Sequence, residues 1–187
     1  MMGPGWGLNV RELGAAGDGE TLDTQSLQAA IDACDRAGGG TVLVPAGRYL
    51  TGALFLRSHV TLHLDAGARL LGSADPAHYP VIEGRWEGIE QPTHAPLLGG
   101  CDLEQVTISG RGTVDGRGEV WWQRHRQGDL RYPRPRLISF QDSRNLLIEG
   151  ITAVNSPSWT VTPLRCDNVT IDRVTILNPA DSPNTDG

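Results

Sequence analysis

The residues with the clearest chemical potential lie at the end of the printed sequence, where positions 178–187 read N-P-A-D-S-P-N-T-D-G. Asp186 follows a β-branched run, residues 169–177, that predicts a strand. A carboxylate on a loop beside a strand is a common position for a catalytic acid or base, because the scaffold fixes its geometry and the loop admits substrate. The same residue types also make ordinary surface turns, so composition alone leaves both interpretations open.

Composition favours one domain built from short strands. A chain of 187 residues can bury a sizeable core, and its 24 glycines, 12 prolines and few aromatic residues are typical of many strands joined by tight turns. A net charge of -6 argues against a general nucleic-acid-binding protein, because phosphate neutralisation needs a basic face. Three widely spaced cysteines predict buried apolar residues, with neither a disulfide framework nor a metal site.

The first fifteen residues contain no basic segment followed by an apolar run, and no window of the sequence approaches the length of a membrane span. We therefore expect a protein without a membrane partner. We expect it to be cytoplasmic, or secreted if a signal peptide has been removed.

A single helix is predicted near the start of the chain, over residues 24–37. Asp23 or Thr24 can serve as its N-cap, three glycines follow it at 38–40, and four apolar residues fall on one face: Leu27, Ala30, Ile31 and Cys34. Residues 8–13 predict a short strand before it, and strands follow from Thr41 onward.

A repeated pattern decides the fold class. Four segments, 58–64, 102–110, 143–150 and 166–172, share a polar turn followed by alternating apolar residues. Ile148 and Ile171 are 23 residues apart, and the 46 residues from Leu62 to Ile108 fit two such periods; the 40 from Ile108 to Ile148 fit two shortened periods or one with a long loop. Such a period predicts an all-β solenoid of parallel strands, with helix 24–37 capping its first coil.

Two stretches do not repeat and are predicted to be projecting loops, residues 73–96 and 116–135. The second brings cations close to aromatic residues, including Trp122 and Arg134. Rings that stack on sugar faces and guanidinium forks that bind carboxylates would make this loop a wall for a sugar acid. The alternative is a solvated loop anchored by its tryptophans.

At this point the order of motifs resembles the glycoside hydrolases of the polygalacturonase type. The matching segments lie along the whole chain: 14–19, 38–47 and 62–68 near the start, then 112–116 with Trp121 and Trp122, Arg134 with Pro135, 155–159, and 184–187. The resemblance implies one domain over residues 1–187 that forms a right-handed parallel β-helix. It also implies hydrolysis of α-1,4 bonds between galacturonic acid units with inversion, without a metal or organic cofactor. The implied partner is an acidic polysaccharide or oligogalacturonide and not a nucleic acid.

By the same resemblance, Asp186 carries over as one of the carboxylates that position the attacking water, and Asn184, Arg134 and Trp122 are candidate substrate-binding residues. The family's later motifs, an Asp-Asp pair that includes the general acid, a Gly-His-Gly segment and an Arg-x-Lys segment, do not occur in these 187 residues. We therefore expect a domain truncated at its C-terminal end, and little or no activity from this polypeptide alone.

Two alternatives stay open. One is a carbohydrate-binding or structural β-helix module without chemistry. The other is a β-helix lyase that uses Ca²⁺ and a basic residue, against which the lack of a dense acidic cluster in the later coils counts.

Overall fold

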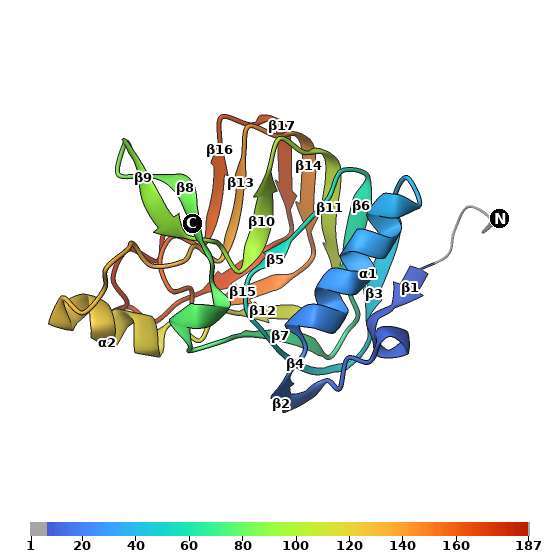
Figure 1. The fold of residues 1–187 in the computed structure, drawn as a ribbon, viewed down its shortest axis with the longest axis horizontal. Coiled ribbons are helices and arrows are strands. Elements are labelled where there is room, and N and C mark those ends of the chain that lie inside the picture. Colours follow the sequence, from blue (N-terminus) through green and yellow to red (C-terminus); the bar gives the residue numbers. More distant parts are fainter. Residues whose placement is uncertain (1–6, 187) are drawn as a thin grey trace.

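Three parallel sheets wind around one core in the computed structural model, which describes residues 7–186 (Figure 1). Sheet A pairs its strands in the order β1 (Gly7–Asn9), β3 (Gly40–Val44), β6 (Val60–Leu64), β11 (Glu104–Gly110), β14 (Arg144–Glu149) and β17 (Asp167–Asp172). Sheet B has the order β2 (Asp18–Leu22), β4 (Gly47–Thr51), β7 (Ala68–Gly72), β12 (Thr113–Asp115), β15 (Thr152–Val154) and β18 (Thr175–Leu177). Sheet C contains β5 (Leu54–Phe55), β10 (Leu98–Cys101), β13 (Ile138–Gln141) and β16 (Val161–Leu164).

The core is a set of columns in which equivalent apolar residues stack from coil to coil. In sheet A one column places Val42, Leu62, Ile108, Ile148 and Ile171 in register. The first four are buried, and burying each such side chain stabilises the fold by about 1.5–3 kcal/mol. The predicted all-β class and the parallel β-helix are therefore confirmed.

The register corrects the predicted spacing of the coils. Leu62 pairs directly with Ile108, so the 46 residues between them form one coil and not two. Ile108 pairs directly with Ile148, which selects the interpretation of one coil with a long loop. Both long coils contain an insertion between sheet B and sheet C, and these insertions are the two non-repeating stretches.

The N-terminal helix is confirmed as α1 (Thr24–Arg36), within one residue of the predicted end, and its predicted apolar face is buried. Asp23 precedes the helix, but its carboxylate accepts hydrogen bonds from Ala16 N and Gly17 N, at 2.6 and 3.0 Å, instead of capping it. The Gln28 amide donates to Phe55 O and accepts from Phe55 N, both at 2.9 Å. Gln28 thus pairs with β5, the edge strand of sheet C, as another strand would.

The strand predicted over residues 8–13 is wrong beyond Asn9. Residues Val10–Leu13 form a 3₁₀ helix, η1, because the Asn9 side chain accepts a hydrogen bond from Arg11 N and Gly14 ends the turn at a φ of 92°.

The first insertion is not only a loop, because it forms an antiparallel hairpin of β8 (Val81–Trp86) and β9 (Ile89–His94) after the short 3₁₀ helix η2 (Pro76–His78). Its two turn residues, Glu87 and Gly88, have φ of 47° and 87°. Two positive φ values are what a tight hairpin turn of matching twist requires.

The second insertion contains a helix, α2 (Glu119–Gln127), so the prediction of a single helix is wrong. Gly128 ends α2 in the left-handed conformation, and the helix buries Trp121 and Trp122. Its other residues are mostly charged or polar, and this hides the narrow apolar face from a reading of periodicity. Among residues 7–186, no helix is long and apolar enough to cross a membrane.

Candidate active site

Asp186 lies where sheet C continues past β16. Its carbonyl oxygen accepts a hydrogen bond from Thr160 N at 2.9 Å, just as Thr160 O accepts one from Ile138 N in the preceding coil. This bond places the residue beside the N-terminal end of β16, on the loop that follows β18. The Asp186 side chain is exposed and lines an open cleft together with Arg136, Trp159 and Thr162.

The residues around Asp186 hold its loop against the coil before it. Thr185 is buried, and its carbonyl oxygen accepts from Thr160 Oγ1 at 2.8 Å and from Asn178 Nδ2 at 2.7 Å. The Asn178 side chain also accepts from Ser156 N, so it joins two coils. The loop is therefore anchored on one side, and the Asp186 carboxylate is exposed on the other. Gly187, the last residue of the matched motif, lies outside the described residues.

Arg134 does not face the cleft as a free guanidinium fork, because it is 2% exposed and its donors are used inside the protein. Nη1 donates to Pro157 O and Pro183 O at 2.8 and 2.7 Å, and Nη2 donates to Asn184 Oδ1 at 2.7 Å. This arrangement corrects the expectation that Arg134 binds substrate through this fork. The Arg134 fork instead fixes the loop that carries Asp186.

Asn184 is exposed and adopts a left-handed φ of 54°, which asparagine tolerates better than most residues. Its side-chain oxygen is occupied by Arg134. The side-chain amide nitrogen remains the group through which Asn184 can reach a ligand, and the substrate-binding role stays a prediction.

Trp122 is also placed differently from the expectation. The ring is 5% exposed, and its Nε1 donates to Ser156 O at 2.9 Å. Burial on the inner face of α2 leaves no ring face for stacking on a sugar. Trp122 therefore anchors α2 to the coil before the site, which is the alternative weighed above for this loop.

The structure places a cation and a ring, Arg136 and Trp159, in the wall of the Asp186 cleft, and a second ring, Trp86, packs against both; sequence reasoning did not select this cluster. The Arg136 guanidinium lies 5.1 Å from the ring centroid of Trp159 and 5.6 Å from that of Trp86, and the two rings are 4.5 Å apart. Burial lowers the pKa of Arg136, but an arginine in this setting keeps its charge at neutral pH. Trp86 comes from the hairpin, Arg136 precedes β13 and Trp159 precedes β16, so only the fold brings the three together.

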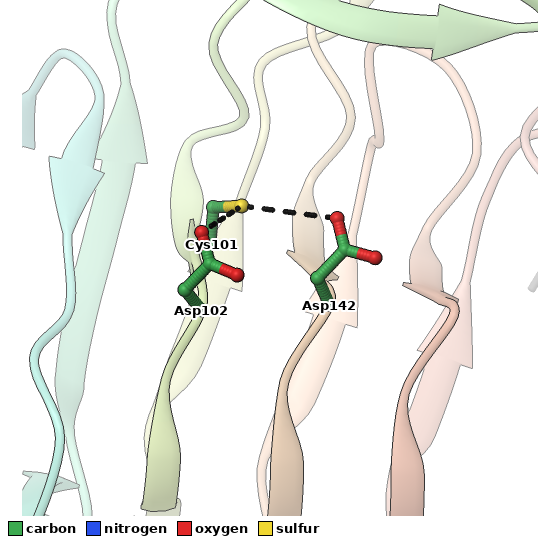
Figure 2. Close-up of side chains that lie close together, drawn as sticks. All are labelled: Cys101, Asp102 and Asp142. Carbon is green, nitrogen blue, oxygen red and sulfur yellow. Dashed lines mark hydrogen bonds between the residues drawn. The ribbon is translucent and has the colours of Figure 1, made fainter.

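A second cluster lies at the far end of sheet C, where Cys101, Asp102 and Asp142 come from the ends of adjacent strands (Figure 2). The Cys101 thiol lies 3.2 Å from Asp102 Oδ2 and 4.0 Å from Asp142 Oδ2. Burial, together with the acidic neighbours, raises the pKa of this thiol to about 11, so it stays protonated and is a poor nucleophile at neutral pH. Cys101 is exposed, which corrects the prediction of three buried cysteines.

Comparison with known proteins identifies the family. The model of glycosyl hydrolases family 28 matches residues 34–187. A probable polygalacturonase of Vitis vinifera is 42% identical over 94% of this chain and 38% of its own length, and an exo-poly-alpha-D-galacturonosidase of Dickeya chrysanthemi is 37% identical over 79% of this chain and 25% of its own length. The crystal structure of a hyperthermoactive exopolygalacturonase from Thermotoga maritima superimposes with a TM-score of 0.88 at 32% identity, covering 100% of this chain and 49% of that one.

The chain therefore belongs to glycosyl hydrolases family 28 and is a parallel β-helix protein of that family. It spans well under half the length of the first two relatives.

Proposed function

We propose that the complete natural protein hydrolyses α-1,4-galacturonosyl bonds in pectic polysaccharide, or in oligogalacturonides, with inversion at the anomeric carbon. The observation that carries this proposal is the position of Asp186, which is an exposed carboxylate on an anchored loop in an open cleft. Membership of the family and the polygalacturonase relatives supply the reaction class.

In this mechanism the Asp186 carboxylate positions and activates water on one face of the sugar ring. A carboxylic acid on the other face, about 6.5–9.5 Å away, protonates the leaving oxygen. The Arg136 cation and the Trp159 ring line the same cleft as Asp186, and Trp86 packs against both, an arrangement that suits an anionic sugar. The chemistry needs no step beyond proton transfer and water attack.

The test is the product formed from polygalacturonate by the complete natural protein. Hydrolysis produces new reducing ends without the ultraviolet absorbance of an unsaturated sugar, and proton NMR of the first product shows the inverted anomer. Unsaturated product would mean elimination, as in the lyase alternative. Binding without any new reducing ends would leave the carbohydrate-binding module as the remaining interpretation.

A further inference from the structure

A cavity of about 210 Å³ lies between the β8–β9 hairpin and the outer face of sheet C. Its floor comes from β5, β10 and β13, and its roof from both strands of the hairpin. The lining residues that matter for the argument are Phe55, Glu83, Trp86, Arg134, Arg136 and Ser139. We call it the hairpin cavity.

The hairpin cavity is lined by two buried cations without a counter-charge. Arg134 and Arg136 are 2% and 8% exposed, and the Nε atom of each is buried without a hydrogen-bond partner. Within residues 7–186 neither guanidinium forms an ion pair with a carboxylate. Glu83 is the one carboxylate in the cavity lining, and it is exposed and paired with neither arginine.

Buried charges of one sign are unfavourable unless an opposite charge or several hydrogen bonds compensate them. The Nη groups of Arg134 are satisfied by carbonyl and amide oxygens, whereas Arg136 has one hydrogen bond, from Nη2 to Arg85 O. An anion bound at Arg136 would supply the missing charge. A carboxylate fits this role, because it accepts a hydrogen bond from guanidinium and is the charged group of a uronic acid.

The hairpin cavity and the Asp186 cleft share Arg136 in their walls. The cavity lies toward the earlier coils, and the hairpin covers sheet C there. Two contacts beside the hairpin turn fix the hairpin to the coils. Arg136 Nη2 donates a hydrogen bond to Arg85 O, and Arg165 Nη1, in the turn after β16, lies 3.3 Å from the Glu90 carboxylate. A polymer that enters the Asp186 cleft from the later coils therefore meets a wall at the hairpin.

We infer that the hairpin cavity binds the carboxylate of a terminal uronic acid through Arg136, with Trp86 against the sugar inside the cavity and Trp159 on the side of the Asp186 cleft, so that cleavage takes place near a chain end. This inference rests on the proposed function. Beyond that function, it specifies where the end of the substrate chain binds and which residue recognises it. Arg136 is the specificity-determining residue, and Arg134 supports it from the same wall.

The first part of the inference, binding of a uronic acid at Arg136, is tested separately from catalysis. The measurement is isothermal titration calorimetry of the complete natural protein carrying Asp186→Asn. The probes are D-galacturonate, D-galactose and sulfate. We expect galacturonate to bind, galactose to bind at least about tenfold more weakly, and Arg136→Gln to weaken galacturonate binding by about 30-fold or more. Arg131→Gln is the matched control, because Arg131 is exposed and lies close to Arg136 in the sequence. Equal binding of sulfate, or unchanged affinity in Arg136→Gln, would overturn the assignment.

The second part of the inference, cleavage near a chain end, is tested on the unsubstituted protein. The earliest products formed from polygalacturonate are separated by chromatography. A single short product from the first minutes, with slow loss of viscosity, is expected; an early ladder of long oligomers would overturn it. Because this product analysis does not use the Arg136→Gln variant, it still tests the inference if that variant does not fold. Failure of all hydrolysis would refute the proposed function and leave the titration to judge the uronate site separately.

Discussion

At the scale of single residues, Arg134 shows how a polar residue near a site can act on the fold and not on the ligand. It lies in a proline-rich segment next to the site, and its charge suggests contact with an acidic sugar. In the structure its fork binds two carbonyl oxygens and the Asn184 side chain, which ties together three parts of the chain. Burial lowers the pKa of Arg134 to about 10, which still leaves the side chain charged at neutral pH.

Replacing Arg134 separates the two roles. Arg134→Met keeps much of the volume but leaves buried acceptors such as Pro157 O unpaired, and each such loss costs about 1–3 kcal/mol. We expect the free energy of unfolding, measured by urea denaturation, to fall by about 2–4 kcal/mol. The control Arg131→Met, at an exposed position, should change it by less than about 0.5 kcal/mol. Unchanged stability in Arg134→Met would return Arg134 to the list of substrate ligands.

At the scale of elements, α1 caps the first coil because one of its side chains makes the hydrogen bonds that a neighbouring strand would otherwise make with the edge of sheet C. The amide of Gln28 satisfies both backbone groups of Phe55 on the edge of sheet C. A sequence pattern predicts the buried face of a helix, but it does not show that a glutamine beside that face pairs with a sheet edge.

Gln28→Leu tests this cap. The substitution keeps helix propensity and removes both hydrogen bonds, so the N–H and C=O of Phe55 lose their partners. We expect a loss of about 1–3 kcal/mol in thermal or urea unfolding. Gln25→Leu, at an exposed position of the same helix, is the control and should be nearly neutral. Equal effects of the two substitutions would contradict the pairing role.

The hairpin is held to the later coils by charges that titrate in acid. Arg165 forms two hydrogen bonds with Asp142, at 2.6 and 2.7 Å, and one with Glu90. The Arg165 side chain lowers the pKa of Asp142, and Arg85 followed by Arg165 lowers the pKa of Glu90. A carboxylate with a lowered pKa in the folded state contributes stability at pH values above its unfolded pKa, and this contribution is lost as the pH falls through the folded pKa.

We therefore expect the hairpin to be protected at neutral pH and to loosen first in acid, below the ordinary pKa range of carboxylates near pH 4. Amide hydrogen exchange of β8 and β9, followed against pH, measures this. In Arg165→Gln the protection should be lower at neutral pH and change less with pH. Arg173→Gln, which removes an arginine paired with Glu149 and Asp172, is the control. Hairpin protection that does not change with pH in the unsubstituted protein would refute the anchoring.

At the scale of the whole molecule, stability comes from the stacking of one coil on the next, and the last described coil lacks cover on one side. Ile171 and Leu177 are 48% and 59% exposed, although their counterparts in earlier coils are interior or partly covered. Unpaired strand edges with exposed apolar residues favour association between chains.

We expect the 187-residue polypeptide expressed by itself to self-associate as its concentration rises, measured by light scattering. Ile171→Thr combined with Leu177→Thr keeps β propensity while lowering the exposed apolar area, and should reduce association. Val81→Thr, at an exposed position in the hairpin, is the control. A monodisperse monomer at all concentrations would contradict this expectation.

Much of the architecture was predictable, because the column of Leu62, Ile108, Ile148 and Ile171 follows from the repeated pattern itself. The number of coils could not be predicted, because a 46-residue coil with an inserted hairpin has the same spacing as two short coils. At the candidate site, the motif around Asp186 was enough to select that residue, and its catalytic role stays a prediction. The cluster of Arg136, Trp86 and Trp159 comes from three separate segments, and no local pattern in the sequence joins them.

The most direct measurement for the whole account is the turnover of polygalacturonate by the complete natural protein carrying Asp186→Asn, compared with Asp181→Asn. Asp181 lies on the same loop and its side chain is 85% exposed, so its change should leave the rate nearly unaltered. Under the proposed mechanism, in which the Asp186 carboxylate activates water, removing its charge should lower the rate by about 10²–10⁴-fold while the unfolding curve stays the same. An Asp186→Asn protein that keeps the full rate would contradict the central claim.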